Sequence, residues 1–326
     1  MNSLNEIYNT KVELKKKLDV IDPDNNVNEI FSQYPSILKN VEYLSIFYTI
    51  MKNNINLSNF YNGRSTVPEN VDFSNVKVPK NVKSLSRLLA NCNNLKTVNM
   101  NGFDFNEVND VSELYSKCTN LVSVDFNNTT FNNVTNMCRT YYNCTNLTGS
   151  PVCGPNVTDM HETYHICTNL TGAPVCGNNV TNMRATYYNC YNLTGAPVCG
   201  PNVTNMQGTY YECTNLTGSP VCGDNVTNMQ GAYSNCHNLH GNSYFYSNNV
   251  SNIQNCFYGR NTSNRLNIYV HKNSTTMNTC IISNANSMVG ARIQWRHSGN
   301  RYYNTTYNIY IYPVENVYTA KINNGD

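Results

Sequence analysis

One short segment has the spacing of a metal-dependent hydrolase. Residues 161–165 read His-Glu-Thr-Tyr-His, which fits H-E-x-x-H. On a helix, His161 and His165 would share one face and could hold a zinc ion, with Glu162 as the general base. Zinc catalysis also needs a third protein ligand and an open coordination position. The sequence offers no evident third ligand near this pair.

The same segment also belongs to a repeated pattern. His161 stands where later copies carry Arg184 and Gln207, and His165 stands where a later copy carries Tyr188. The two histidines are therefore better explained as variants at repeat positions than as zinc ligands. No Ser-His-Asp set, phosphate-binding glycine loop or carboxylate pair stands out either. We expect no enzyme activity, no catalytic residue, no metal and no cofactor.

The 14 cysteines could form disulfides, bind metal or fill a core. They lack C-x-x-C spacing, and in a stacked repeat their side chains would point the same way, which is poor disulfide geometry. Small buried thiols pack well, so we expect reduced thiols. Five of these cysteines recur every 23 residues: Cys144, Cys167, Cys190, Cys213 and Cys236.

The cysteines mark a repeat with two parts. The first part is illustrated by Val180, Met183, Tyr187 and Cys190, whose steps of three, four and three predict one face of a short helix. The second part starts at Leu193 or its equivalents and predicts a short strand of two or three paired residues, limited by proline. Such a unit cannot bury its apolar side alone, so eight copies must stack as a solenoid with strands ~4.8 Å apart. Asparagines at one repeat position are expected to bond the turning backbone from inside the stack: Asn146, Asn169, Asn192 and Asn215.

The repeated Asn-Val-Thr-Asn-Met, aromatic pair and Asn-Cys-Thr-Asn-Leu resemble the BspA-like leucine-rich repeat. The pattern is clearest in residues 179–183, 187–193 (with Tyr191 in place of Thr), 202–206 and 210–216, and it covers about residues 80–260. The resemblance implies an α/β repeat fold, a leucine-rich-repeat solenoid of eight short strand-helix units. Shortened copies with Pro-Val-Cys-Gly depart from that family and leave the sheet length and curvature open.

The two ends differ from the repeat. Residues 1–60 predict helices, either a short heptad-like coiled coil or a single amphipathic helix, for attachment or oligomerisation. Parts of residues 11–38 loosely resemble the start of bacteriophage tail- and head-fibre proteins, which are often trimers. Residues 262–326 alternate with period two and predict a β-rich C-terminal cap on the solenoid, which takes up residues 61–261.

Composition narrows the partners. Charged residues are 13% of the chain and the formal net charge is +2, with no basic stripe, so nucleic acid is not an expected partner. No run reaches the ~18 apolar residues of a membrane span, so we expect no membrane insertion. The first residues show no secretory signal pattern. Neutral polar residues dominate instead, and asparagine alone makes up about a fifth of the chain.

Aromatic residues are the candidates for binding. Tyrosines that follow the core tyrosine in three copies would form an outer row suited to protein or sugar contact, although packing between coils explains them equally simply. Aromatic residues of the cap are the second group. The candidate residues are Tyr142, Tyr188, Tyr211, Trp295, Tyr302 and Tyr303.

These observations favour a non-enzymatic bacteriophage virion protein, a fibre or host-attachment component. It would contact other virion proteins through its N-terminal helices and bind a host surface protein or glycan. A homotrimer is implied only by the resemblance to fibre proteins. It would be assembled in the host cytoplasm and located on the virion. The alternative is a bacterial or protist cell-surface adhesin of the BspA-like type.

Overall fold

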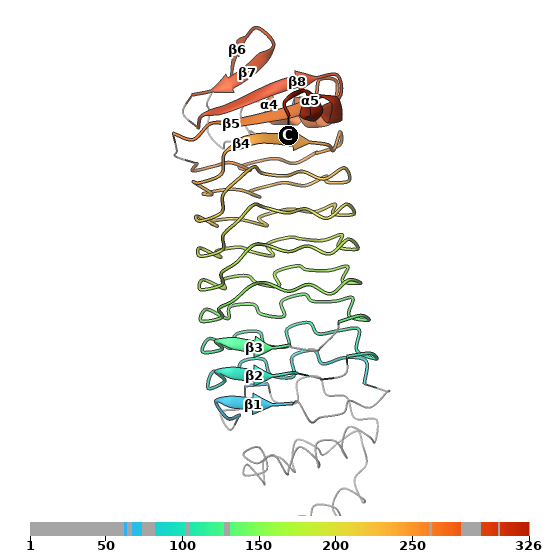
Figure 1. The fold of residues 1–326 in the computed structure, drawn as a ribbon, viewed down its shortest axis with the longest axis vertical. Coiled ribbons are helices and arrows are strands. Elements are labelled where there is room, and N and C mark those ends of the chain that lie inside the picture. The colour runs from blue at the N-terminus through green and yellow to red at the C-terminus, as the bar shows by residue number, and fades with distance from the viewer. Residues whose placement is uncertain are drawn as a thin grey trace, which may run out of the picture.

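The repeats form a tall stack of coils, each lying directly on the one before (Figure 1). In the computed structural model, isolated parallel bridges join one residue of each coil to the next, from Ser84↔Asp110 through to Asn228↔Asn252. The structure describes residues 62–63, 67–73, 82–101, 103, 105–126, 131–260, 263–281, 295–305 and 307–325. The segment 1–60, for which helices were predicted, lies outside this part of the chain.

Among the described coils that precede the terminal sheet, regular strands occur in the longer, 26-residue coils at the start of the stack. Strands β1 (Asn70–Asp72), β2 (Thr97–Asn99) and β3 (Ser123–Asp125) form a parallel three-stranded sheet. Their register is continuous, with Val71 opposite Val98 and Val98 opposite Val124. In the 23-residue coils the Pro-Val-Cys-Gly segment replaces this strand, and proline has no N–H for a ladder.

The segment predicted as a helix is instead a series of tight turns. In one coil, the N–H groups of Met137, Arg139 and Tyr141 all donate to carbonyls of the following coil, at 2.8 to 3.0 Å. The residues between them close three-residue turns within their own coil, as Thr140 N–H does on the Met137 carbonyl. In an α-helix, each of these N–H groups would instead donate to the carbonyl four residues back in the same segment. The 3-4-3 spacing therefore marks an inward-facing side of a turning backbone.

Left-handed residues explain how the backbone turns so tightly. In the same coil, Arg139 and Asn143 have φ of 55° and 58°, and the equivalent pair recurs in the other coils. Asparagine and glycine tolerate this conformation better than most residues, and a run of right-handed helix excludes it. Asn189 and Gly208 are later examples, with φ of 59° and 60°.

The predicted fold class is therefore wrong. The described residues contain eight strands but only two helices, α4 (Thr275–Ile281) and α5 (Val317–Asn323), and both follow the repeats. A leucine-rich-repeat solenoid of strand-helix units is not what this chain forms. The repeated asparagines also differ from expectation: Asn146, Asn169 and Asn192 are exposed, and the Asn192 side chain donates to the Thr168 carbonyl of the preceding coil from the surface, at 3.0 Å.

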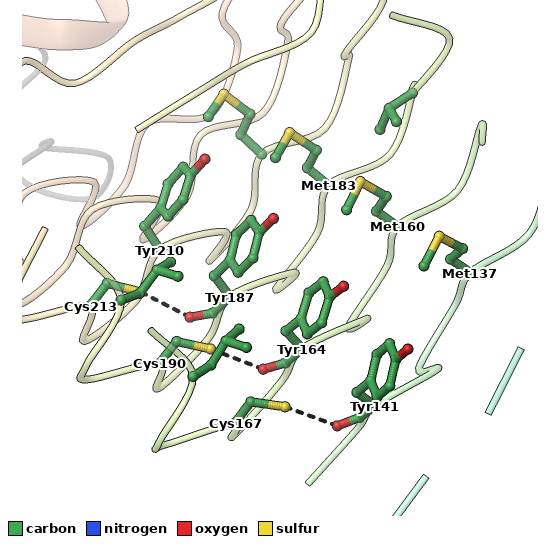
Figure 2. Close-up of a cluster of buried hydrophobic side chains, with 14 of the residues drawn as sticks. Met137, Tyr141, Met160, Tyr164, Cys167, Met183, Tyr187, Cys190, Tyr210 and Cys213 are labelled. Atoms are coloured by element: carbon green, nitrogen blue, oxygen red, sulfur yellow. Dashed lines mark hydrogen bonds between the residues drawn. The ribbon is translucent and has the colours of Figure 1, made fainter. Parts of the chain in front are cut away.

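The core consists of columns of identical side chains (Figure 2). Tyr164, Tyr187 and Tyr210 are fully buried and stack with ring centroids 5.5 and 5.6 Å apart. In the cysteine column that runs from Cys144 to Cys236, each thiol donates to the tyrosine carbonyl of the coil before it, for example Cys190 to Tyr164 at 3.0 Å. Cys213 does the same to Tyr187 at 2.9 Å. Every cysteine of the chain is a free thiol, as the sequence predicted.

The last part of the chain widens into a five-stranded sheet at the end of the stack (Figure 1). Its order is β4 (Gly241–Phe245), β5 (Leu266–His271), β8 (Ile309–Val314), β7 (Arg301–Asn304) and β6 (Arg296–Ser298). The first three strands are parallel and continue the direction of the coils, whereas β7 and β6 are antiparallel. Bridges from Gly218 to Leu239 and from Cys222 to Phe245 join this sheet to the preceding coil.

A buried arginine fastens the sheet to the stack. Arg260 takes the place that cysteine holds in earlier coils, and its side chain is fully buried. Its guanidinium donates to the carbonyls of Leu239 at 2.7 Å and Asn264 at 2.6 Å, and also to that of Tyr307. The Arg260 side chain thus connects the last repeat to the chain segments that lead into the strands of the terminal sheet.

Neither α4 nor α5 has the length and hydropathy needed to cross a bilayer, and they are the only helices in the described ranges.

Candidate binding face

One side of the stack carries a second aromatic column, which we call the outer ladder: Tyr142, His165, Tyr188 and Tyr211. Each residue directly follows a core tyrosine, so it points away from the core. The rings are stacked nearly parallel, with centroids 4.8 Å apart between Tyr142 and His165 and 4.7 Å between His165 and Tyr188. The closest pair is Tyr188 and Tyr211, at 4.4 Å and 4°. All four side chains are half-buried.

The predicted tyrosines are therefore brought together, and they pack between coils as the simpler alternative proposed. Stacking leaves the ring edges and hydroxyls at the surface and covers most ring faces. Burial raises the pKa of the Tyr188 hydroxyl to about 12, with further contributions from Tyr211 and Glu212. Burial also lowers the pKa of His165 from its ordinary value, so this imidazole is held neutral within the ladder.

A charged cluster fills the surface beside the first coils of the outer ladder. Glu162 accepts hydrogen bonds from Arg139 at 2.7 Å and from Arg184 at 3.1 Å. His161 Nε2 lies 2.9 Å from the same carboxylate. Burial would raise the pKa of Glu162, but the bonds and charges of Arg139 and His161 outweigh it and hold that pKa below its ordinary value. Glu162 is thus paired with Arg139, Arg184 and His161 within this cluster.

The H-E-x-x-H histidines thus serve two different structural roles. His165 lies inside the outer ladder, whereas His161 belongs to the charged cluster around Glu162. The helix that would have aligned them is absent, because residues 161–166 form turns. Within the described ranges, no three His, Cys, Asp or Glu side chains are grouped so as to hold a metal ion.

Beyond Tyr211 the same face opens into a recess of about 310 Å³. Two repeat positions account for it. The position that carries Arg139 and Glu162 in earlier coils becomes Gly208 and then Gly231, so no side chain covers the space. The outer-ladder position becomes Ser234, a small buried residue, before an aromatic ring returns at Tyr258. The lining residues are Tyr188, Gln207, Gly208, Tyr211, Gln230, Gly231, Ser234, Asn255 and Tyr258.

The aromatic residues predicted at the C-terminal end do not form one site. Tyr302 and Tyr303 are neighbours on β7, so their side chains leave opposite faces of the sheet. Trp295 and Tyr302 pack against the hydrophobic core, while Tyr303 stacks with Tyr310 at 6.0 Å. None of the three contributes to the recess.

An arginine–tyrosine group on the same sheet had not been predicted. The guanidinium carbon of Arg265 lies 3.9 Å from the Tyr310 ring centroid, and that of Arg301 lies 5.3 Å from it. Arg265 also bonds Asn267 at 2.7 Å and the Tyr312 hydroxyl. These contacts hold the arginine side chains on the sheet, so we treat the group as structural.

Sequence reasoning also missed most of the recess. It identified Tyr188 and Tyr211 but not Gln207, Gln230 or Ser234. The available signal was the column of residues after the core aromatic, which from Tyr142 onward reads Tyr, His, Tyr, Tyr, Ser, Tyr. Within this stretch, the one small residue, Ser234, marks the opening.

The repeats match a known family model over most of the chain. The model is described as "Mycoplasma protein of unknown function, DUF285", and it matches residues 55–175, 158–265 and 181–295. Together these segments cover residues 55–295, well over half of the sequence. The chain belongs to the DUF285 family. No curated protein and no solved structure matches it.

The DUF285 match supports a family of repeat-containing surface proteins related to the BspA-like repeat proteins. The predicted resemblance is confirmed at that level. The match does not support a bacteriophage fibre, nor the BspA-like type specifically.

Proposed function

We propose that this protein is a non-enzymatic surface protein that binds a ligand on another cell through the outer ladder and the recess beside it. The observation that carries this proposal is the uncovered end of the outer ladder. Tyr211 stacks on Tyr188, but the outer-ladder position of the next coil holds only Ser234. A rigid aromatic surface beside neutral hydrogen-bonding groups is typical of binding surfaces.

The regular stack suits such a role. The rings of the outer ladder are held by stacking on one another, so these residues need little ordering when a ligand arrives. The backbone of the face is bonded from coil to coil, as when Asn189 N–H donates to the Tyr211 carbonyl at 2.8 Å. A preorganised surface of this kind is suited to binding, because little conformational entropy is lost when the ligand binds.

The cell-surface adhesin is the form of this proposal that the family match favours. The virion alternative rests on a resemblance within residues 11–38, which lie outside the described part of the chain, as does the segment expected to mediate trimerisation. Two measurements separate the alternatives. Antibody labelling of intact producing cells would support the adhesin, whereas recovery of the chain from purified phage particles by mass spectrometry would support the virion component.

Binding itself is tested with purified chain coupled to fluorescent beads and a panel of bacterial and animal cells. We expect beads to attach to at least one cell type, and attachment to fall when Tyr188 and Tyr211 are both changed to Ala. Tyr318→Ala is the matched control, because Tyr318 is an exposed tyrosine on α5 outside the recess lining. No attachment to any cell, or equal attachment by the double variant, would reject the proposed function.

A further inference from the structure

The recess has the arrangement of an aromatic stack with one ring missing. Tyr211 and Tyr258 occupy the outer position of two coils that are separated by the coil of Ser234. Successive coils joined by parallel bridges lie ~4.8 Å apart, so two coil steps leave about 9.6 Å between these outer positions. The stacked rings of the outer ladder are 4.4 to 4.8 Å apart. A single ring inserted above Ser234 would therefore meet an aromatic side chain on each face.

Neutral hydrogen-bonding groups surround this gap. Gln207, Gln230 and Asn255 contribute amides, and no charged side chain lines the recess. The Gln207 amide nitrogen donates weakly to the Gln230 oxygen at 3.4 Å, and Asn252 donates to that same oxygen at 3.2 Å. These contacts leave the Gln230 nitrogen and the Gln207 oxygen for a ligand, one donor and one acceptor.

The side chains at one repeat position become smaller along the face, from Arg139 and Glu162 through Ala185 to Gly208 and Gly231. In the coils of Arg139 and Glu162 the equivalent positions are charged and paired with each other. In the coils of Gly208 and Gly231 they are bare, with Cα positions close to the aromatic rings: a Cβ added to Gly208 would lie 3.6 Å from Tyr188. Larger side chains there would cover the rings. The recess thus combines aromatic side chains, amides and open space, which fits a sugar ring better than a charged peptide.

We propose that the recess above Ser234 binds one pyranose ring of an uncharged glycan. The apolar C–H faces of the sugar pack on Tyr211 and Tyr258, and its hydroxyls bond the amides of Gln207 and Gln230. This inference rests on the proposed function, since it names the ligand class for the same face. The volume of about 310 Å³ is at the lower end of ligand pockets, as a single ring requires.

The decisive variant is Ser234→Tyr, which supplies the missing ring. The new tyrosine would stack between Tyr211 and Tyr258 and fill the recess, so the melting temperature should rise or stay unchanged while the ligand is excluded. Loss of binding then cannot be attributed to unfolding. Ser298→Tyr, the same substitution on exposed strand β6 outside the recess lining, is the matched control. Gln230→Leu tests the amide contact separately.

The probe is an array of oligosaccharides that end in glucose, galactose, mannose or N-acetylglucosamine, together with sialylated and sulfated counterparts. We expect the full chain and Ser298→Tyr to bind at least one uncharged terminus. Ser234→Tyr and Gln230→Leu should each weaken that binding about tenfold or more, because stacking and a ligand hydrogen bond are lost.

The outcomes separate this inference from the proposed function. Unchanged glycan binding by Ser234→Tyr, or binding only to charged glycans, would overturn the inference. Attachment of the chain to cells without binding to any glycan would also overturn it, while leaving the proposed function standing with a protein ligand. Failure to bind any cell and any glycan would overturn both.

Discussion

The hydroxyl of Tyr187 bonds both backbone groups of Val175 across the interior of a single coil. It donates to the Val175 carbonyl at 2.8 Å and accepts from the Val175 N–H at 3.0 Å. Val175 lies in the Pro-Val-Cys-Gly segment, where no regular strand forms to satisfy these groups. Equivalent pairs occur in the neighbouring coils, for example Tyr210 with Val198. The core tyrosine therefore substitutes for the ladder bonds that the shortened coil has lost.

Tyr187→Phe should destabilise the protein by about 1–3 kcal/mol, because it leaves a buried N–H and a buried carbonyl without a partner. Tyr115→Phe is the matched control. Tyr115 is equally buried, but its hydroxyl has no hydrogen-bond partner among the described residues. Its removal should be neutral or slightly stabilising. Urea denaturation followed by circular dichroism measures both, and an equal loss for the two variants would contradict the role given to the hydroxyl.

The columns of the core could be predicted from the sequence, but the backbone that carries them could not. Any stacking of 23-residue units places Cys167, Cys190 and Cys213 in one line, whatever the local conformation. The 3-4-3 spacing, however, is compatible with a helix and with the observed turns. The two are distinguished by the acceptors of the backbone N–H groups. The N–H of Tyr141, for example, donates to a carbonyl of the next coil. Recurrent Asn143 and Asn189 at left-handed positions were the available hint.

The candidate site was predictable in part for a similar reason. A column of aromatic residues is visible in the repeat, so Tyr142, Tyr188 and Tyr211 could be found. The recess depends on which side chains are missing, namely at Gly208 and Ser234, and on knowing that their positions lie beside the ladder. That neighbourhood follows from the turn geometry, which the sequence pattern did not reveal.

The cysteine thiols should be unreactive in the folded protein. Reaction requires the thiolate, and burial raises the pKa of even the half-buried Cys138 and Cys199 to about 11. We expect little reaction with a thiol reagent at neutral pH under native conditions, and 14 free thiols per chain after denaturation. Rapid native labelling would contradict the burial of these columns, and fewer than 14 thiols after denaturation would indicate disulfides.

His165 should make stability depend on pH. Burial lowers its folded pKa below the ordinary value of 6.5, so protonation favours the unfolded chain. Its contribution is fully present above about pH 6.5 and is lost as the pH falls below that value. His165→Tyr restores the ring found at Tyr188 and Tyr211 and removes the titrating group. Melting temperatures between pH 7.5 and 5.5 should therefore fall less for this variant, and an unchanged slope would exclude His165 as the cause.

Arg260 should govern the attachment of the terminal sheet. Burial lowers its pKa to about 10, and its three carbonyl partners belong to the last repeat and to the segments that precede β5 and β8. Arg260→Met keeps an apolar stem but leaves those carbonyls unsatisfied, so we expect a loss of about 3 kcal/mol or more. Hydrogen exchange should quicken in β5 and β8 but not in β2 and β3. Arg265→Met, which changes an exposed arginine of the same sheet, should cost about 1 kcal/mol or less. If both substitutions lowered stability equally, or if hydrogen exchange quickened uniformly along the stack, Arg260 would not be the residue that holds the terminal sheet to the repeats.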